Sequence, residues 1–279
     1  MQKHRVLLIL VSLILIIALY FLPRIVVDNE KDMQIGAEKS EEAVVDDDGD
    51  VNNDIMNLHS AEIPDEDQSR IEDLRKGMNA EEEQRLVLAD SLANLFTSYN
   101  QYDSAAKYYD IIATEHPGLD EYERAGNAYY DAFGFAMERD NANIYSEKAR
   151  HYFDLVLKED PSRLDIKNKL AMAYISSPNP MQGISMLREI ILEDPENEEA
   201  LFNLGILAVQ SGQYERGRER FKNLVSLYPK NLQAQFYLAL CYYELGEKED
   251  AIRQFELVRS MEDDPAVLAT IEGYLKELN

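Results

Sequence analysis

A chain of 279 residues, 46% of them hydrophobic, is long enough for one or two domains with a buried core. Its 53 acidic and 28 basic residues give a formal net charge of −25, which argues against a nucleic-acid partner and against an electrostatic hold on anionic lipid. The one cysteine, Cys241, excludes an internal disulfide but does not decide the cellular compartment.

The first 27 residues contain an uncharged apolar run, Val6–Leu22, that follows Lys3 and Arg5. At 1.5 Å per helical residue this run spans about 25 Å, and a snorkelling Arg24 would extend it by a few residues. A hydrocarbon core is about 30 Å thick, so we predict a transmembrane anchor over residues 1–27. The alternatives are a cleaved signal peptide, which would need a shorter apolar run and a small-residue cleavage site that is not seen, and a buried core helix.

The orientation of this anchor is predicted from its flanks. Lys3, Arg5 and the terminal amine precede the span, whereas Arg24 and Lys31 follow it, and the leading tail is very short. We therefore predict a single-pass membrane protein whose amino terminus is cytoplasmic. The bulk of the chain would then lie outside the cytoplasm, which means the periplasm if the organism is a Gram-negative bacterium.

Residues 28–63 form an acidic segment with few aromatic residues and no apolar periodicity. Such a segment cannot bury enough apolar surface to offset the entropy of ordering, so we predict a disordered spacer. The run Asp46–Asp54 suggests a calcium loop, but its spacing excludes an EF-hand. When the loop starts at Asp46, Val51 stands where glycine is required and Asn57 where glutamate is required.

A repeating pattern of large and small residues is clearest over 198–231. Leu201, Leu204 and Ala208 share one stripe of a first helix, and Phe221 lies on the inner stripe of a second. Gly212 permits the tight reversal between the two helices. One hairpin of this kind cannot bury both of its faces, so the pattern calls for stacked neighbours.

The same register recurs along the chain and resembles the tetratricopeptide repeat, a 34-residue helix–turn–helix unit. The resemblance implies an all-α fold, a right-handed α-solenoid with a concave groove lined by the first helices, over residues 64–279. The predicted units are about 86–118, 119–163, 164–197, 198–231 and 232–265, with a capping helix over 265–278.

The second unit is longer than the others. Residues 119–163 exceed the 34-residue period by eleven, almost three helical turns, which we expect to be divided between the two helices. The extra segment carries five large apolar side chains, namely Phe133, Phe135, Met137, Ile144 and Tyr145. These side chains either pack on one another along a long hairpin or form a projecting tip that contacts a partner.

By the geometry of the repeat family, four positions of each first helix face the groove. In the first two units the wall is polar and acidic, because Asp90 and Glu123 stand beside the candidate residues. In the later units the wall is apolar. The candidate partner-binding residues are Asn94, Asn127, Tyr130, Met172, Ile175, Phe202, Ile206, Val209, Phe236, Leu240 and Tyr243. An apolar wall indicates a partner, unless the last helix folds over it or the side chains pack between helices.

Some tetratricopeptide repeat domains clamp a terminal carboxylate with groove lysines and arginines, and this sequence lacks that set. Arg124 and Lys169 do not restore it, so an apolar or basic peptide suits the groove better than an acidic tail. The sequence contains no glycine-rich phosphate loop, nucleophile elbow or metal-ligand spacing. We therefore expect no enzyme activity, no cofactor and no metal.

These features together predict a membrane-tethered scaffold that binds proteins or peptides during assembly, secretion or quality control of envelope proteins. The order of anchor, spacer and repeat domain resembles that of translocon-associated and cytochrome-maturation accessory proteins of bacteria. Two alternatives stay open. The solenoid could self-associate through its apolar groove as a homo-oligomer, or groove tyrosines could bind cell-wall glycan.

Overall fold

The computed structural model describes residues 63–279. The predicted anchor over residues 1–27 and all but the last residue of the predicted spacer lie outside the described residues. In the described part, no helix combines the length and the apolar character needed to cross a membrane.

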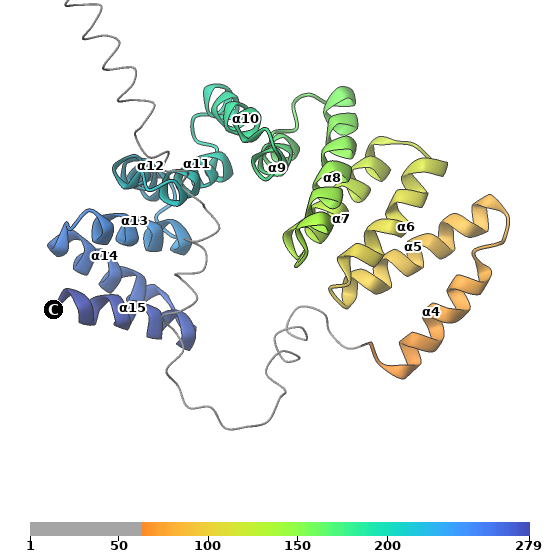
Figure 1. The fold of residues 1–279 in the computed structure, drawn as a ribbon, viewed down its shortest axis with the longest axis horizontal. Coiled ribbons are helices and arrows are strands. Elements are labelled where there is room, and N and C mark those ends of the chain that lie inside the picture. The colour runs from red at the N-terminus through yellow and green to blue at the C-terminus, as the bar shows by residue number, and fades with distance from the viewer. Residues whose placement is uncertain (1–62) are drawn as a thin grey trace, which may run out of the picture. The chain divides into compact units, whose positions relative to one another are not determined.

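Residues 63–279 form twelve α-helices and no strand (Figure 1). The helices are α4 (Asp65–Gly77), α5 (Glu82–Ser98), α6 (Tyr102–Glu115), α7 (Leu119–Gly134), α8 (Arg139–Glu159), α9 (Leu164–Ile175), α10 (Pro180–Glu193), α11 (Glu198–Gln210), α12 (Tyr214–Leu227), α13 (Leu232–Glu244), α14 (Lys248–Met261) and α15 (Pro265–Leu278).

Helices α5 to α14 pair in chain order as five hairpins. The two helices of each hairpin contact one another, and the second helix contacts the first helix of the next hairpin. The first helices α9, α11 and α13 also contact their neighbours directly. This local, sequential packing is that of a helical-repeat solenoid, in which each unit buries its apolar stripe against the next.

The reversal inside three hairpins uses one residue in the left-handed region of backbone space. Gly212 has φ +70° and Gly246 has φ +71°, each two residues after its first helix ends. Asn100 occupies the corresponding place after α5, with φ 56°. Asparagine tolerates this conformation better than most side chains, so the first hairpin turns as tightly as those with glycine.

The core repeats one close contact between a small residue and an aromatic ring. Phe153, Phe221 and Phe255 are fully buried on the second helices of three hairpins. A Cβ added at Gly126 would lie 2.8 Å from the Phe153 ring, and one added at Gly205 would lie 2.7 Å from the Phe221 ring. The small residues of the pattern therefore let the first helix approach the ring that fills the interior of the hairpin.

The long second hairpin accommodates its eleven extra residues in both helices and in the turn. Helix α7 has 16 residues and α8 has 21, whereas α11 and α12 have 13 and 14. The turn 135–138 is one residue longer than the turn 211–213. Phe135 and Met137 at this tip are 50% and 65% exposed, and Ile144 is 55% exposed. The five apolar residues therefore do not all pack on one another.

Cys241 is a core residue of α13. Its side chain is fully buried, and burial raises the pKa of the thiol to about 11. The thiolate is the reactive form, so a thiol with this pKa has about a hundredfold less of it at pH 8 than an ordinary cysteine. We expect a disulfide reagent at pH 8 to label the native chain at least about a hundredfold more slowly than the chain in concentrated guanidinium. Similar rates in both solvents would contradict this burial.

Candidate functional site

An apolar opening lies along the later first helices, and we call it the apolar groove. Its volume is about 670 Å³. Four of the predicted site residues line it, namely Met172 of α9, Phe202 and Ile206 of α11, and Phe236 of α13. The other lining residues are Asn203, Leu232, Gln233, Tyr237, Val258, Glu262, Val267 and Thr270.

The rings of the apolar groove are held by packing against the core. Phe202 lies edge-on to Tyr237, with ring centroids 5.8 Å apart, and edge-on to the buried Phe221 at 5.9 Å. Phe236 is edge-on to Phe255 at 5.9 Å and to Tyr274 at 6.3 Å. The half-buried rings therefore present a firm apolar wall, because each is fixed by a neighbour on another helix.

The remaining predicted residues of the apolar wall do not line this groove. The Tyr243 hydroxyl donates a 2.5 Å hydrogen bond to Glu277, and its ring packs on Tyr274 at 5.0 Å, so α15 covers that end of the wall. Ile175 packs with a buried cluster of α9, α10 and α11, and Val209 packs with one of α11, α12 and α13. Leu240 is half-buried on α13. Folding of the last helix over the wall, one of the two alternatives left open, thus describes the α13 end, where α15 packs on Tyr243 and Phe236 and leaves the groove open beside Phe202.

The predicted residues of the polar wall belong to a network between repeats. Asn94 donates to Asp90 at 2.8 Å and accepts from the Tyr109 hydroxyl at 2.9 Å. Arg124 of the next repeat forms an ion pair with Asp90. Arg124 therefore neutralises Asp90, which the sequence predicted to lie in an acidic wall. The Asn94 side chain already has hydrogen-bond partners within the chain.

The second polar pair is neutralised in the same way. The two terminal guanidinium nitrogens of Arg163, Nη1 and Nη2, donate to Glu123 at 2.7 Å, and this interaction lowers the pKa of the Glu123 carboxyl. Lys169 donates to Asn127 at 2.7 Å. Burial raises the pKa of the Tyr130 hydroxyl to about 12, and its ring lies 6.0 Å from that of Phe153. The polar wall therefore joins repeats to one another, and the apolar groove remains as the candidate binding surface.

Sequence reasoning missed the part of the groove that second helices and α15 supply. Val258 and Glu262 lie at the end of α14 and just beyond it, and Val267 and Thr270 lie in the first turns of α15. The positional rule considers first helices only, and treating α15 as the first helix of a sixth unit would have included Val267 and Thr270. Glu262 is the one charged lining residue, and its carboxylate accepts the backbone N–H groups of Asp263 and Asp264.

The side chains of the groove are suited to non-covalent binding of a segment of another chain. Its rings and aliphatic side chains would bury apolar side chains, and the carboxamides of Asn203 and Gln233 can hydrogen-bond a peptide backbone. Within residues 63–279 no cluster of three histidine, cysteine or acidic side chains is placed to hold a metal ion.

A model of the tetratricopeptide repeat family matches residues 202–265, the stretch that holds Phe202, Ile206 and Phe236. The described chain has a tetratricopeptide repeat fold. A solved tetratricopeptide repeat protein from Parabacteroides merdae is 20% identical, with a TM-score of 0.56, and the match covers 75% of this chain and 79% of that one. A tetratricopeptide repeat protein of Thermus thermophilus is 14% identical, with a TM-score of 0.50 and coverage of 68% and 98%. No curated protein sequence matches the chain.

Proposed function

We propose that the chain is a membrane-tethered tetratricopeptide repeat scaffold that binds a segment of another protein in the apolar groove. The observation that carries this proposal is the groove itself, an opening of about 670 Å³ walled by fixed aromatic rings. A monomeric soluble surface rarely leaves such an apolar concavity unused. The polar network of the first repeats, by contrast, has its hydrogen bonds satisfied within the chain.

The chemistry of the groove favours an apolar segment, extended or helical, over an acidic one. The one charged lining residue is the carboxylate of Glu262, and the whole chain carries a charge of −25. At low salt, where charges are weakly screened, this negative charge would repel an acidic partner. Tyr237, the one tyrosine that lines the groove, is stacked on Phe221 and edge-on to Phe202, which favours a peptide ligand over a stacked glycan.

The proposed place of action rests on the sequence of the first residues. The run Val6–Leu22 supports an uncleaved anchor, with the repeats outside the cytoplasm and the acidic spacer between them. In that location the scaffold would take part in assembly, secretion or quality control of envelope proteins, as a binding protein without catalysis.

Topology is tested with a protease-sensitive tag at each end of the full chain. We expect protease added to intact spheroplasts to remove the carboxy-terminal tag and to leave the amino-terminal tag untouched until the cells are opened. A carboxy-terminal tag that stays protected in intact spheroplasts would contradict the proposed location. Release of the repeats from washed membranes as a shorter chain would indicate a cleaved signal peptide instead of an anchor.

A further inference from the structure

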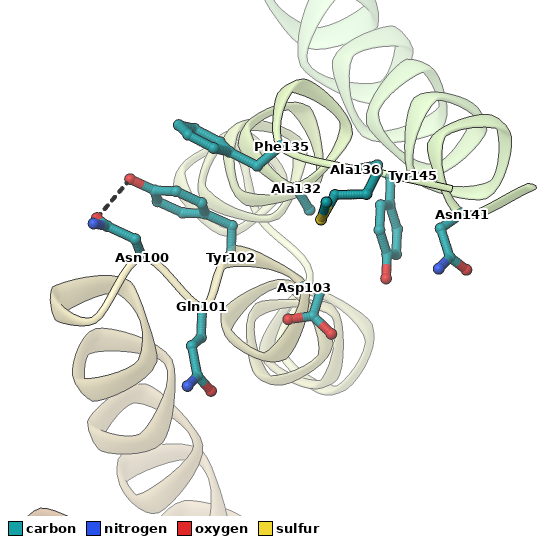
Figure 2. Close-up of a pocket in the computed structure, with 10 residues that line it drawn as sticks. Asn100, Gln101, Tyr102, Asp103, Ala132, Phe135, Ala136, Asn141 and Tyr145 are labelled. Carbon is teal, nitrogen blue, oxygen red and sulfur yellow. Dashed lines mark hydrogen bonds between the residues drawn. The ribbon is translucent and has the colours of Figure 1, made fainter. Parts of the chain in front are cut away.

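A second opening lies where the tip of the long second hairpin meets the turn of the first hairpin, and we call it the tip cleft. Its volume is about 340 Å³ (Figure 2). One wall is the α5–α6 turn with the first residues of α6, and the other is formed by the end of α7, the turn 135–138 and the start of α8. None of its lining residues lines the apolar groove.

The lengthened hairpin builds this cleft. Phe135 and Met137 lie in the turn between α7 and α8, and Asn141 and Tyr145 lie in the first two turns of α8. A hairpin of the length of α11–α12 would have fewer residues at this end with which to form the wall. The eleven extra residues of the second unit therefore coincide with an additional concave surface.

The two walls are fixed to one another by an aromatic stack. The Tyr102 ring stacks on the Phe135 ring, with centroids 4.9 Å apart. The Tyr102 hydroxyl donates to the Asn100 side chain at 3.0 Å, and Figure 2 shows this bond beside the stacked pair. Asn100 therefore has two roles, because it takes the left-handed turn conformation and anchors the ring that meets the tip.

The apolar side of the cleft is exposed to an unusual degree. Phe135 keeps half of its surface exposed in spite of the stack, and Met137 is 65% exposed. Ile144, on the same tip, is 55% exposed. Three large apolar side chains exposed within ten residues are typical of a surface that a partner covers.

The polar side of the cleft gathers acceptors around one negative charge. Figure 2 shows Asp103 between Gln101 on one side and Tyr145 and Asn141 on the other. Asp103 is the one charged residue among those that line the cleft. Its cation within the described residues is Lys107, one turn away at 3.3 Å; the Lys107 side chain is largely exposed and that of Asp103 is about half exposed. An exposed pair of this kind contributes little, at most about 1 kcal/mol, so an incoming cation can replace it.

Two further groups at the rim are ready to bond a ligand. Within residues 63–279 the Gln101 carboxamide and the Tyr145 hydroxyl form no hydrogen bond. Burial and the Asp103 carboxylate, which lines the same cleft, raise the pKa of the Tyr145 hydroxyl. A planar guanidinium, with five donors, fits several acceptors at once better than a point charge does.

We propose that the tip cleft is a second binding site, specific for a segment of a partner protein in which an arginine adjoins an apolar residue. The apolar side chain packs on Phe135 and Met137, and the guanidinium meets Asp103 together with the carboxamide oxygens of Gln101 and Asn141. Charge complementarity selects this partner, since the cleft offers one carboxylate and no cation among its lining residues. The site is carried by different residues from those of the apolar groove and does not depend on that groove's function.

The test uses the full chain with ¹³C-labelled methionine methyl groups. Met137 reports on the tip cleft and Met172 on the apolar groove, each signal being assigned with a methionine-to-leucine variant. The probes are the peptide N-acetyl-Leu-Arg-Leu-amide and its citrulline counterpart, which has the same shape without the charge. We expect the arginine peptide to shift the Met137 signal saturably, with Met172 unchanged, and the citrulline peptide to bind at least about fivefold more weakly.

A matched pair of variants tests whether Asp103 is the carboxylate that binds the arginine. Asp103→Asn should reduce binding of the arginine peptide to the level of the citrulline peptide, whereas Asp140→Asn should leave it within about twofold. Asp140 is an exposed acid on the same tip, does not line the cleft and forms no ion pair within the described residues. Both changes are at exposed or half-exposed carboxylates, and an unchanged methionine spectrum without peptide shows that each variant is folded.

Three results would overturn the proposal. One is a Met137 signal that shows no saturable shift up to about 10 mM peptide, because a dissociation constant above this concentration is too weak for a specific site. Another is equal binding of the two peptides or an Asp103→Asn variant that binds normally. The third is a shift of Met172 without Met137, which would place the peptide in the apolar groove and so support the proposed function while removing the second site.

Discussion

Gly183→Ala is expected to lower the free energy of unfolding by about 2 to 4 kcal/mol, the largest loss expected for a glycine-to-alanine change in the described residues. An added Cβ would lie 2.1 Å from the backbone carbonyl oxygen of Ala171. It would also lie 2.7 Å from Cγ1 and 3.0 Å from the backbone nitrogen of Ile175. Two of these atoms are backbone, so rotation of a side chain cannot relieve the overlap, and α10 must separate from α9.

Gly273→Ala provides the matched control for this prediction. Gly273 lies inside α15, and a Cβ there would meet nothing within 4 Å. Alanine is favoured over glycine in a helix interior, so we expect this variant to be more stable by about 0.5 to 1 kcal/mol. Urea unfolding of the two variants, followed by circular dichroism, measures the difference. Equal midpoints would show that α9 and α10 are not packed as closely as the structure has them.

Arginine at the lip of the apolar groove is expected to weaken partner binding at least about tenfold, equal to about 1.4 kcal/mol. The variant is Gln233→Arg/Thr270→Arg. Both side chains line the groove and both are exposed, so the substitutions leave the core intact. A charged residue in place of Phe202 or Phe236 is a poorer test, because each ring also packs on a buried aromatic ring and its loss would destabilise the repeat.

The matched control for the lip variant is Ser185→Arg/Ser226→Arg. These serines are exposed on the second helices α10 and α12, away from the groove, and the control adds the same charge. Binding of a purified partner to the two variants is compared by titration calorimetry. The groove assignment fails if the control weakens binding as much as the lip variant does.

The repeat pattern predicted the hairpins because large and small residues at fixed spacing directly determine which face is buried. Gly205 and Phe221, for example, are complementary in the structure as the spacing indicates. The candidate site was less predictable. Position alone placed Asn94 and Asn127 in a groove, but it could not show that Tyr109 and Lys169 already bond them. Such contacts within a repeat and between successive repeats depend on side-chain reach, which a one-dimensional pattern does not contain.

The tip cleft is a second feature that the sequence predicted only in part. The excess length of the second unit and its apolar residues were evident from the sequence. The meeting of Phe135 with Tyr102 was not, because it depends on how far the hairpin extends past its neighbour. Asn100 carried a usable signal, since it stands where the later repeats have Gly212 and Gly246.

The most direct test of the central claim, that the apolar groove binds another protein, is photocrosslinking in cells that produce the full chain. A photoreactive phenylalanine analogue replaces Gln233 in the groove or, as the control, Ser226 on the outer face. We expect one discrete protein to be crosslinked from position 233. This product should be absent when the analogue is at position 226 and should be lost when Thr270→Arg is added. The same products from both positions, or none from position 233, would contradict it, and a crosslink to a second copy of the chain would replace the partner with self-association.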